Sequence, residues 1–544
     1  MNKLILVSCP PWGLVMPPLG IAYLSAYLKS KGVQTDILDL NLALYEQADS
    51  KQQIFWQLDE INRIKPLNIA RNIFQAFEKE IDQFAKSLSE YQIIGFSANN
   101  LISAIFGGFA AEKIKSLYPD KIIILGGPGI YHSWDRNTVN KENIDFFIIG
   151  EGEEALLKFI KEFEVNQSPD YLCSKVPGLL YAKDSANIRY LPWQSIKDLN
   201  SLVYPTFEGF DLSKYNKNTK YHPLPMLMSR GCINQCSYCV DWYICSVFRM
   251  RQPEKVIVEM KYLKQKYNIT HIEFNDLLCN GNLHALYKLC CLMQKENLNL
   301  IWISYAAIRK NMTQELLDAM KLAGCNSLCY GVESGSDAIL EKMNKHYNSA
   351  DAQAVIEKTF KAGINVSLNI IVGFPGETKD DFQKTIDFIR ANRKYIAQVT
   401  NVSSFVLMPG SNVGIYPQHF GVKFLDPLDP GKWTDANALT PAERNQRVGI
   451  ICDLLKELNI KNLIVNYQDK EAKLCIDKNK KRDKINNQLN ENIQACDLNF
   501  KSFKRKNKIF KYILLAGLFF ISIIIDFYLY ILKKLRGSII FPGN

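Results

Sequence analysis

The chain lacks the features that mark secreted proteins. Its 14 cysteines are spread over 544 residues, which is too sparse for a disulfide framework. The opening apolar run, from Leu4 to Val7, is too short for the core of a signal peptide. These absences argue against a small, disulfide-stapled secreted domain, and we expect a reducing, cytosolic location.

The chain also has only a small excess of positive over negative charge. The net charge is +11 at pH 7, which is modest for a chain of this length. Hydrophobic residues make up 47% and charged residues 22%, values that are typical of globular proteins. The length exceeds that of one ordinary core, so we expect about three or four domains.

Much of the positive charge lies in one basic segment without an intervening acid: Lys501, Lys504, Arg505, Lys506, Lys508 and Lys511. It leads into an apolar run over 512–532, interrupted by Asp526, that reaches the roughly 20 residues needed to cross a bilayer. This combination favours a membrane surface over nucleic acid as the partner. The far flank is basic too, so a spanning helix, an in-plane anchor and a buried helix all stay open. We expect 506–544 to be a membrane anchor.

The most informative motif is a cysteine triad. Cys232, Cys236 and Cys239 have C-x3-C-x2-C spacing and alternate with glycine and polar residues that make poor core filler. Three thiolates can hold three corners of a four-iron cluster and leave the fourth iron open for a substrate. A zinc site would need a fourth ligand, and Cys245 offers one at a distance unusual for zinc. The triad therefore favours an iron–sulfur cluster, with zinc as the alternative.

The triad resembles the signature of radical S-adenosylmethionine (SAM) enzymes, and Tyr238 fits the aromatic position before the last cysteine. The resemblance implies that the three cysteines bind a 4Fe–4S cluster. It implies that SAM chelates the open iron, and that one electron cleaves SAM to a 5'-deoxyadenosyl radical. A reducing partner such as flavodoxin or ferredoxin is expected to supply that electron.

The first 165 residues are predicted to form an α/β domain. Strands are expected at 3–8, 33–40, 93–97, 121–125 and 146–149, and helices at 19–31 and 102–118. Near-continuous apolar strands between helices predict a parallel sheet covered on both faces. Ligands of such sheets lie beyond the carboxyl ends of the strands, where Ser97, Gly126 and Gly127 fall. Each glycine can serve ligand approach or only a tight turn.

This segment resembles the Rossmann-like cobalamin-binding domain that precedes the radical SAM domain in one large class of these enzymes. The likeness covers Pro17-Pro18-Leu19-Gly20, Gly95-Phe96-Ser97, Leu125-Gly126-Gly127-Pro128 and Gly150-Glu151-Gly152-Glu153. It implies that Ser97, Gly126 and Gly127 bind cobalamin. The D-x-H-x-x-G motif, whose histidine ligates cobalt in the wider cobalamin family, is absent, and His132 is expected to be a loop residue.

A turn-rich segment over 166–222 is expected to be a linker, and strand–helix units repeat through 223–425. Their strands are expected to begin near 225, 271, 298, 327, 365 and 398. The strands end in polar or glycine-rich pieces, where barrel enzymes build active sites. About six units predict a partial (β/α)6 barrel as the radical SAM core. Residues 426–505 are expected to be a helical accessory region with a polar linker.

The resemblance implies roles for six residues of this core. Asn275 and Asp276 match the contact to the methionyl amino group, Glu333 and Ser334 the contact to the SAM carboxylate and ribose, and Gly373 and Gly376 the stretch near the adenine. Arg249 and Arg251 suit an anionic group, although a solvated surface is the favoured interpretation. Five other cysteines lack ligand spacing and are expected to be core thiols: Cys279, Cys290, Cys291, Cys325 and Cys329.

Together these parts imply cobalamin-dependent methylation of an unactivated carbon in a small molecule, either lipid-like or a secondary metabolite. The predicted anchor favours a lipid-soluble substrate and a location on the cytoplasmic face of a membrane. A cobalamin-dependent cyclase or rearrangement enzyme is an alternative. Methylthiotransferases usually add cluster cysteines in their N-terminal domain, for which this chain shows only Cys9 and Cys173. A membrane-held cobalamin or cluster sensor is the alternative from another class.

Overall fold

The computed structural model describes residues 3–57, 66–131, 136, 138–183, 188–217, 223–241, 245, 247–425 and 431–462. The predicted basic segment and apolar run within 501–532, much of the predicted accessory region, and His132 lie outside these ranges. Within them, no helix is long and apolar enough to span a bilayer. The described residues therefore do not test the predicted anchor.

The N-terminal part contains a six-stranded sheet in the order β2-β1-β3-β4-β5-β6. Its strands are β1 (Leu4–Ser8), β2 (Thr35–Leu38), β3 (Ile93–Ser97), β4 (Ile122–Gly126), β5 (Phe146–Ile148) and β6 (Leu179–Tyr181). The first five pair in parallel, as predicted, and β6 pairs antiparallel with β5. The edge strand β6 and helix α9 (Pro169–Lys175) lie in the segment predicted to be a linker, so regular structure continues past residue 165.

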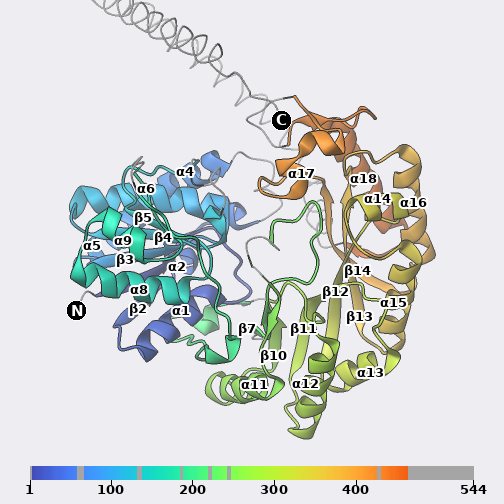
Figure 1. Cartoon of the computed structure of the whole chain (residues 1–544), viewed down its shortest axis with the longest axis horizontal. Helices are drawn as coiled ribbons and strands as arrows, with labels where there is room; N and C mark the ends of the chain where they lie inside the picture. Colours follow the sequence, from blue (N-terminus) through green and yellow to red (C-terminus); the bar gives the residue numbers. More distant parts are fainter. Residues whose placement is uncertain are drawn as a thin grey trace, which may run out of the picture. The chain divides into compact units, whose positions relative to one another are not determined.

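Both faces of this sheet are buried, in agreement with its apolar strands. In β1, Leu4 and Leu6 pack in one hydrophobic cluster, and Ile5 and Val7 pack in another. Helices that cover the two faces are α1 (Leu19–Ser30) and α8 (Gly152–Val165) for the first cluster, and α4 (Pro66–Ala76), α5 (Glu78–Ser87) and α6 (Leu101–Leu117) for the second. Figure 1 shows α6 and α8 on opposite sides of the strands. The strand ends are therefore the part of the sheet left open to a ligand.

The central part contains a second sheet of seven strands in the order β17-β14-β13-β12-β11-β10-β7. Its strands are β7 (Pro223–Met226), β10 (His271–Phe274), β11 (Ile301–Ala306), β12 (Cys325–Glu333), β13 (Asn365–Val372), β14 (Ile396–Ser404) and β17 (Lys461–Asn462). All neighbouring pairs are parallel. From β7 to β14, each strand lies beside the next one in the sheet, which is the repeating α/β arrangement that the sequence predicts.

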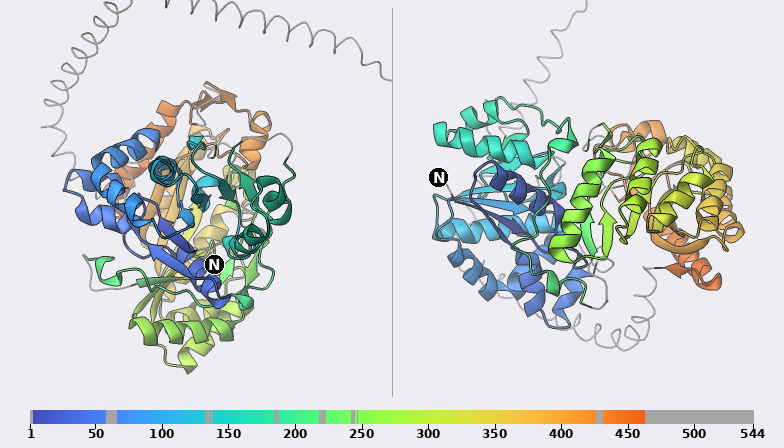
Figure 2. Two further views of the ribbon diagram at one scale, coloured as in Figure 1. Left: turned by 90° about the vertical axis from the view of Figure 1, so that its left-hand side faces the viewer. Right: turned by 90° about the horizontal axis from the view of Figure 1, so that it is seen from below.

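Helices pack along one face of this sheet. They are α11 (Pro253–Tyr267), α12 (Leu283–Lys295), α13 (Gln314–Leu322), α15 (Ser349–Lys361), α16 (Lys379–Ala391) and α18 (Pro441–Glu457). Side chains that accept hydrogen bonds from the first turn begin five of them: Asn282, Thr313, Asn348, Thr378 and Thr440. Figure 2 shows neighbouring helices of this series side by side along the strands.

Shorter elements, with η for a 3-10 helix, connect the strands and helices. They are α2 (Leu40–Gln47), η1 (Gln52–Trp56), η2 (Pro128–Ile130), η3 (Leu199–Ser201), η4 (Leu212–Lys214), β8 (Ser229–Arg230), β9 (Arg249–Met250), α14 (Asp337–Lys342), α17 (Asn412–Ile415), η5 (Pro417–Phe420), β15 (Lys423–Phe424) and β16 (Trp433–Thr434). Strands β8 and β9 pair antiparallel and lie on either side of the cysteine motif in the chain.

Candidate active site

The cysteine loop begins directly after β8, and later parts of the barrel hold its backbone. The Cys239 N–H donates to the Cys236 carbonyl at 3.1 Å, which closes the turn between the last two cysteines. The Ser237 N–H donates to the Met343 carbonyl, and the Val413 N–H donates to the Ser237 carbonyl, each at 3.0 Å. The loop is therefore fixed between the end of α14 and the start of α17.

The three thiols of this loop differ in exposure. Cys236 is buried, whereas Cys232 and Cys239 are half-buried. Burial raises the pKa of the Cys232 and Cys236 thiols, so metal binding would release their protons. The Asn234 N–H donates to the Cys232 sulfur at 3.4 Å, a contact that suits a thiolate ligand. Across the described ranges, no three His, Cys, Asp or Glu side chains lie close enough together to bind one metal ion. The three sulfurs of the loop are therefore near one another in the chain but do not form a closed ligand set.

Glu333, at the end of β12, is held beside the cysteine loop by a buried cation. Its Oε1 accepts the Tyr238 hydroxyl at 2.9 Å and the Lys345 ammonium at 3.1 Å. Burial alone would lower the pKa of Lys345, but Glu333, with Tyr347 and Tyr238, raises it well above its usual range. The Glu333 carboxylate is thus anchored by a permanently charged lysine next to the predicted cluster ligands.

Ser334 is fully buried, and its hydroxyl is used within the fold. It shares a hydrogen bond of 3.1 Å with the Thr385 hydroxyl and accepts the Ser336 N–H at 3.1 Å. The Ser334 N–H also donates within the fold, to the Val332 carbonyl at 2.8 Å, so the side chain and the N–H of Ser334 both serve the fold.

Asp276 follows β10, and its carboxylate also faces the fold. Its Oδ2 accepts the Met228 N–H at 3.1 Å, and its Oδ1 accepts the Ser229 hydroxyl. The side chain is 2% exposed, and burial raises its pKa to about 7. Asp276 thus positions the backbone that leads into the cysteine loop. Asn275, by contrast, is exposed and lines the cavity described below.

The glycine-rich turn after β13 is fixed by buried carboxylates. The Gly373 N–H donates to Glu377 Oε2 at 2.7 Å, and the Gly376 N–H donates to Asp435 Oδ2 at 2.7 Å. Arg447 pairs with Glu377 at 2.6 Å, while burial raises the pKa of Glu377 to about 7. Both glycines have left-handed φ values, +76° and +80°, so the turn itself requires them.

A cavity of about 350 Å³ lies at the carboxyl ends of β3 and β4, and Ser97, Gly126 and Gly127 line it. A Cβ on Gly126 would meet only the Ile148 carbonyl oxygen, at 3.7 Å, so this glycine leaves room for a ligand. A Cβ on Gly127 would lie 2.5 Å from the Ala98 carbonyl oxygen, and its φ is +102°. Gly127 is therefore required by the turn, and Gly126 is the one that suits ligand approach.

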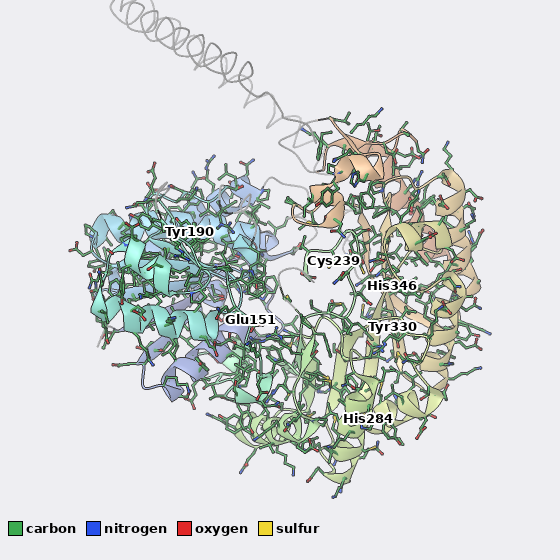
Figure 3. The ribbon with its side chains drawn as sticks, in the orientation of Figure 1. Glu151, Tyr190, Cys239, His284, Tyr330 and His346 are labelled. Carbon is green, nitrogen blue, oxygen red and sulfur yellow. The ribbon has the colours of Figure 1, made fainter. Side chains whose placement is uncertain are left out.

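The segment that carries the first cysteine of the triad forms another wall of this cavity. Arg230 and Gly231 line it, directly before Cys232 in the chain. Arg230 donates to Glu153 Oε1 at 2.5 Å, and its Nη1 lies 3.3 Å from Glu151 Oε2. Burial alone would raise the pKa of Glu153, but Arg230 holds it below its usual range. Ion pairs therefore join the Gly-Glu-Gly-Glu motif to the cysteine loop; Glu151 and Cys239 are labelled in Figure 3.

Arg249 and Arg251 form ion pairs shielded from water, which corrects the prediction of a solvated surface. Arg249 Nη2 lies 2.6 Å from Glu151 Oε1. Arg251 is 2% exposed, and its Nη1 lies 2.6 Å from Glu259 Oε2. The Tyr23 hydroxyl donates to Glu259 Oε1 at 3.3 Å, which ties α1 to α11. A buried guanidinium needs such a carboxylate, and here the chain itself provides it.

The cysteines outside the triad divide into two groups. Cys279, Cys290 and Cys325 are buried, which agrees with the prediction of core thiols. Cys291 is exposed and Cys329 is half-buried, so that prediction is wrong for these two. An amphipathic helix or strand buries the side chains of one face and exposes those of the other. The spacing of the cysteines alone does not reveal which face each one occupies.

Sequence reasoning missed four residues that shape this site: Glu151, Glu153, Arg230 and Lys345. A signal existed for three of them, because both glutamates belong to the Gly-Glu-Gly-Glu motif and Arg230 directly precedes Gly231 and Cys232. Lys345 lies 12 residues after Glu333 with a helix between them, and nothing in the sequence marks that pair.

The barrel matches a known family model. Residues 226–389 match the Radical SAM superfamily, a span that contains all three cysteines of the loop and the ends of β10, β12 and β13. The chain is a radical SAM enzyme. The cluster-ligand assignment for its three cysteines stays a prediction, as do the SAM contacts.

Two curated proteins are similar to this radical SAM enzyme over most of its length. An uncharacterized methyltransferase of Pyrococcus horikoshii is 23% identical over 408 residues, which is 74% of this chain and 79% of the relative. The anaerobic magnesium-protoporphyrin IX monomethyl ester cyclase of Rubrivivax gelatinosus is 24% identical over 385 residues. That match covers 69% of this chain and 62% of the cyclase, so it spans less than two thirds of that relative.

Among solved structures, the radical SAM enzyme is similar to the radical SAM methyltransferase TsrM from Kitasatospora setae, a structure with cobalamin and a 4Fe–4S cluster bound. The TM-score is 0.59 at 17% identity, and the match covers 82% of this chain and 85% of TsrM. Because the central barrel is less than half of the chain, this coverage extends the shared fold to the N-terminal sheet.

Proposed function

We propose that this radical SAM enzyme cleaves SAM reductively with a 4Fe–4S cluster held by Cys232, Cys236 and Cys239, and uses cobalamin to methylate an unactivated carbon of a small molecule. One observation carries the proposal: Gly126 and Arg230 line the same cavity. A cofactor bound at the carboxyl ends of β3 and β4 would therefore lie beside the loop that holds the cluster ligands. This adjacency suits a reaction that needs both groups at one substrate.

When bound, the cluster supplies the electron that cleaves SAM, and cobalamin supplies the methyl group. The residues of the chain then have positioning roles. Lys345 keeps the Glu333 carboxylate oriented beside the loop, where it can accept a hydrogen bond from SAM. Asp276 fixes the strand end before the cysteines, and the exposed Asn275 would contact the methionyl amino group of SAM.

The N-terminal cavity fits cobalamin in one respect and constrains it in another. The open side of Gly126 lets a bulky ligand approach the backbone, and Ser97 offers a hydroxyl at the same edge. In the part of the chain that the structure describes, no histidine lines this cavity. None of the described residues of the cavity wall would therefore offer an imidazole to cobalamin.

Burial of two thiols disfavours the methylthiotransferase alternative. Cys9 and Cys173 are each 0% exposed and belong to separate hydrophobic clusters. Burial raises the pKa of Cys173 to about 12, and it also raises that of Cys9, so both stay neutral thiols. A second cluster on these residues would require the N-terminal core to open.

A cobalamin-dependent cyclase is the second candidate function. The observation that favours it is the match to the Rubrivivax gelatinosus cyclase over 385 residues. The same cofactors would serve, and only the fate of the substrate radical would differ.

We extend the proposal to location and partners. The basic segment and the apolar run over 512–532 support attachment to the cytoplasmic face of a membrane, by spanning or by lying in its plane. A lipid-soluble substrate would then meet the enzyme at the bilayer. Flavodoxin or ferredoxin would supply the electron.

The test is product analysis on the anaerobically reconstituted full chain with cobalamin, SAM and a reductant. Methylation predicts 5'-deoxyadenosine together with S-adenosylhomocysteine. Cyclisation or rearrangement predicts 5'-deoxyadenosine alone, and a sensor predicts neither product. Cys236→Ala should abolish both products, whereas the exposed Cys291→Ala should retain them. Intact SAM with the wild-type chain and a reduced cluster would overturn the proposal.

A further inference from the structure

The seven-stranded sheet has one face that is not packed against helices at β10 and β11. Ile272 and Phe274 of β10 are 2% and 1% exposed and pack in the helix-covered core. Successive side chains of a strand point to opposite faces, so Glu273 lies on the other side. The same alternation in β11 buries Trp302 and exposes Ile303. We call this side the inner face.

The inner face carries an apolar strip along β11. Ile301, Ile303 and Tyr305 occupy alternate positions and are 41%, 36% and 44% exposed. Isolated exposed hydrophobic residues are common, but three in line on one strand make a continuous apolar surface. Active sites of barrel enzymes lie at the carboxyl ends of the strands, and Tyr305 lies near that end of β11, so this strip suits the apolar body of a ligand.

Glu273 is the acidic group beside this strip. In the sheet it is paired with Ile303 of β11 on one side and Pro225 of β7 on the other. It is half-buried, and its carboxylate makes no hydrogen bond or ion pair with the residues that the structure describes. Burial raises the pKa of Glu273, which expresses the cost of leaving its charge without a partner.

Polar side chains farther along the sheet, on β12, β13 and β14, differ from Glu273 because they form hydrogen bonds with one another. Ser327 and Ser367 share a hydrogen bond of 3.2 Å, and the Gln398 amide donates to Ser367 at 2.9 Å. The Cys329 thiol donates to Asn369 Oδ1 at 3.6 Å. These groups do not need a ligand, whereas a cation or N–H donor would complete the environment of Glu273.

We propose that Glu273 and the apolar strip of β11 select a substrate with an apolar body and one positively charged or N–H-donating group. Ile303 and Tyr305 take the apolar body, and Glu273 takes the donor. This inference rests on the proposed function, because it names the substrate class of that same active site. It disfavours a carboxylate-bearing substrate, whose anionic group would lie against Glu273.

Three probes that share one apolar body but differ in the polar group separate the apolar contact from the contact with Glu273. They are 4-phenylbutylamine, 4-phenylbutanol and 4-phenylbutyrate. Equilibrium dialysis against the anaerobically reconstituted full chain at neutral pH gives a Kd for each. We expect the amine to bind about tenfold tighter than the alcohol, and the carboxylate to bind weakest. Glu273→Gln should remove the preference for the amine. The matched control Glu164→Gln, which removes the same charge from the exposed end of α8, should keep it.

A second variant tests the apolar half of the surface. Tyr305→Ala should weaken all three probes by a similar factor, because it shortens the strip and leaves Glu273 in place. Equal binding of the amine and the carboxylate, a preference that survives Glu273→Gln, or no binding of any probe would each overturn the inference. SAM cleavage by the same wild-type preparation separates this failure from failure of the proposed function.

Discussion

Asp276 gives a prediction whose size follows from its surroundings. The carboxylate is 2% exposed, and burial raises its pKa from 3.8 to about 7. Between these two values the native state keeps a proton that the unfolded state has lost. Its contribution to stability is therefore complete below the unfolded pKa and is lost as pH rises through about 7. At about 1.4 kcal/mol per pH unit, the loss from about pH 5 to about pH 8 is about 3 kcal/mol.

Asp276→Asn removes this titration and leaves an oxygen to accept one of the two hydrogen bonds. Urea unfolding of the wild-type and variant chains, without cluster, gives the free-energy difference at about pH 5 and about pH 8. We expect that difference to shift by about 3 kcal/mol in favour of the variant at the higher pH. Ser229→Ala should enlarge the total wild-type loss between these two pH values, because the Ser229 hydroxyl stabilises the carboxylate and its removal raises the pKa of Asp276 further. A difference between wild type and Asp276→Asn that is the same at both pH values would refute the reasoning.

Two further predictions concern the ion pairs and the C-terminal segment. Glu153→Gln should lower the free energy of unfolding by about 3 kcal/mol, because the Arg230 guanidinium, shielded from water, then keeps one ion pair, the longer one to Glu151. Adding Arg230→Met should recover part of that loss in the same urea experiment, and a double variant no more stable than the single one would contradict the pairing. Deletion of residues 506–544 should abolish co-sedimentation of the chain with phosphatidylglycerol vesicles, and equal co-sedimentation of both chains would rule out the proposed anchor.

Strand placement could be predicted because each buried strand leaves a local record. Ile93–Ser97 is a mainly apolar run that ends before turn residues, and its observed limits agree with the predicted ones. Asn365–Val372 begins where the sequence predicts a strand. Leu179–Tyr181 left no such record, since a three-residue edge strand among turn residues lacks a visible period. This strand forms because it pairs with β5, a contact that its own sequence does not indicate.

The candidate site could be predicted only in part, because the sequence shows neither the direction of a side chain nor its partners far away in the chain. The sequence places Asp276 and Ser334 at strand ends, but it does not show that both side chains turn into the fold. Arg249 looked solvated because its carboxylate partner, Glu151, lies 98 residues away in the chain. Such pairs depend on how two sheets meet, which no local pattern encodes.

The link from Glu151 and Glu153 to Arg230 and Arg249 also limits how these halves can be recombined. A hybrid that takes its first 165 residues from another protein keeps a folded cysteine loop only if the donor brings matching carboxylates. Without them, two guanidinium groups would lose their counter-ions in a place that water hardly reaches. A hybrid protein of this architecture should therefore take both glutamates and both arginines from the same parent.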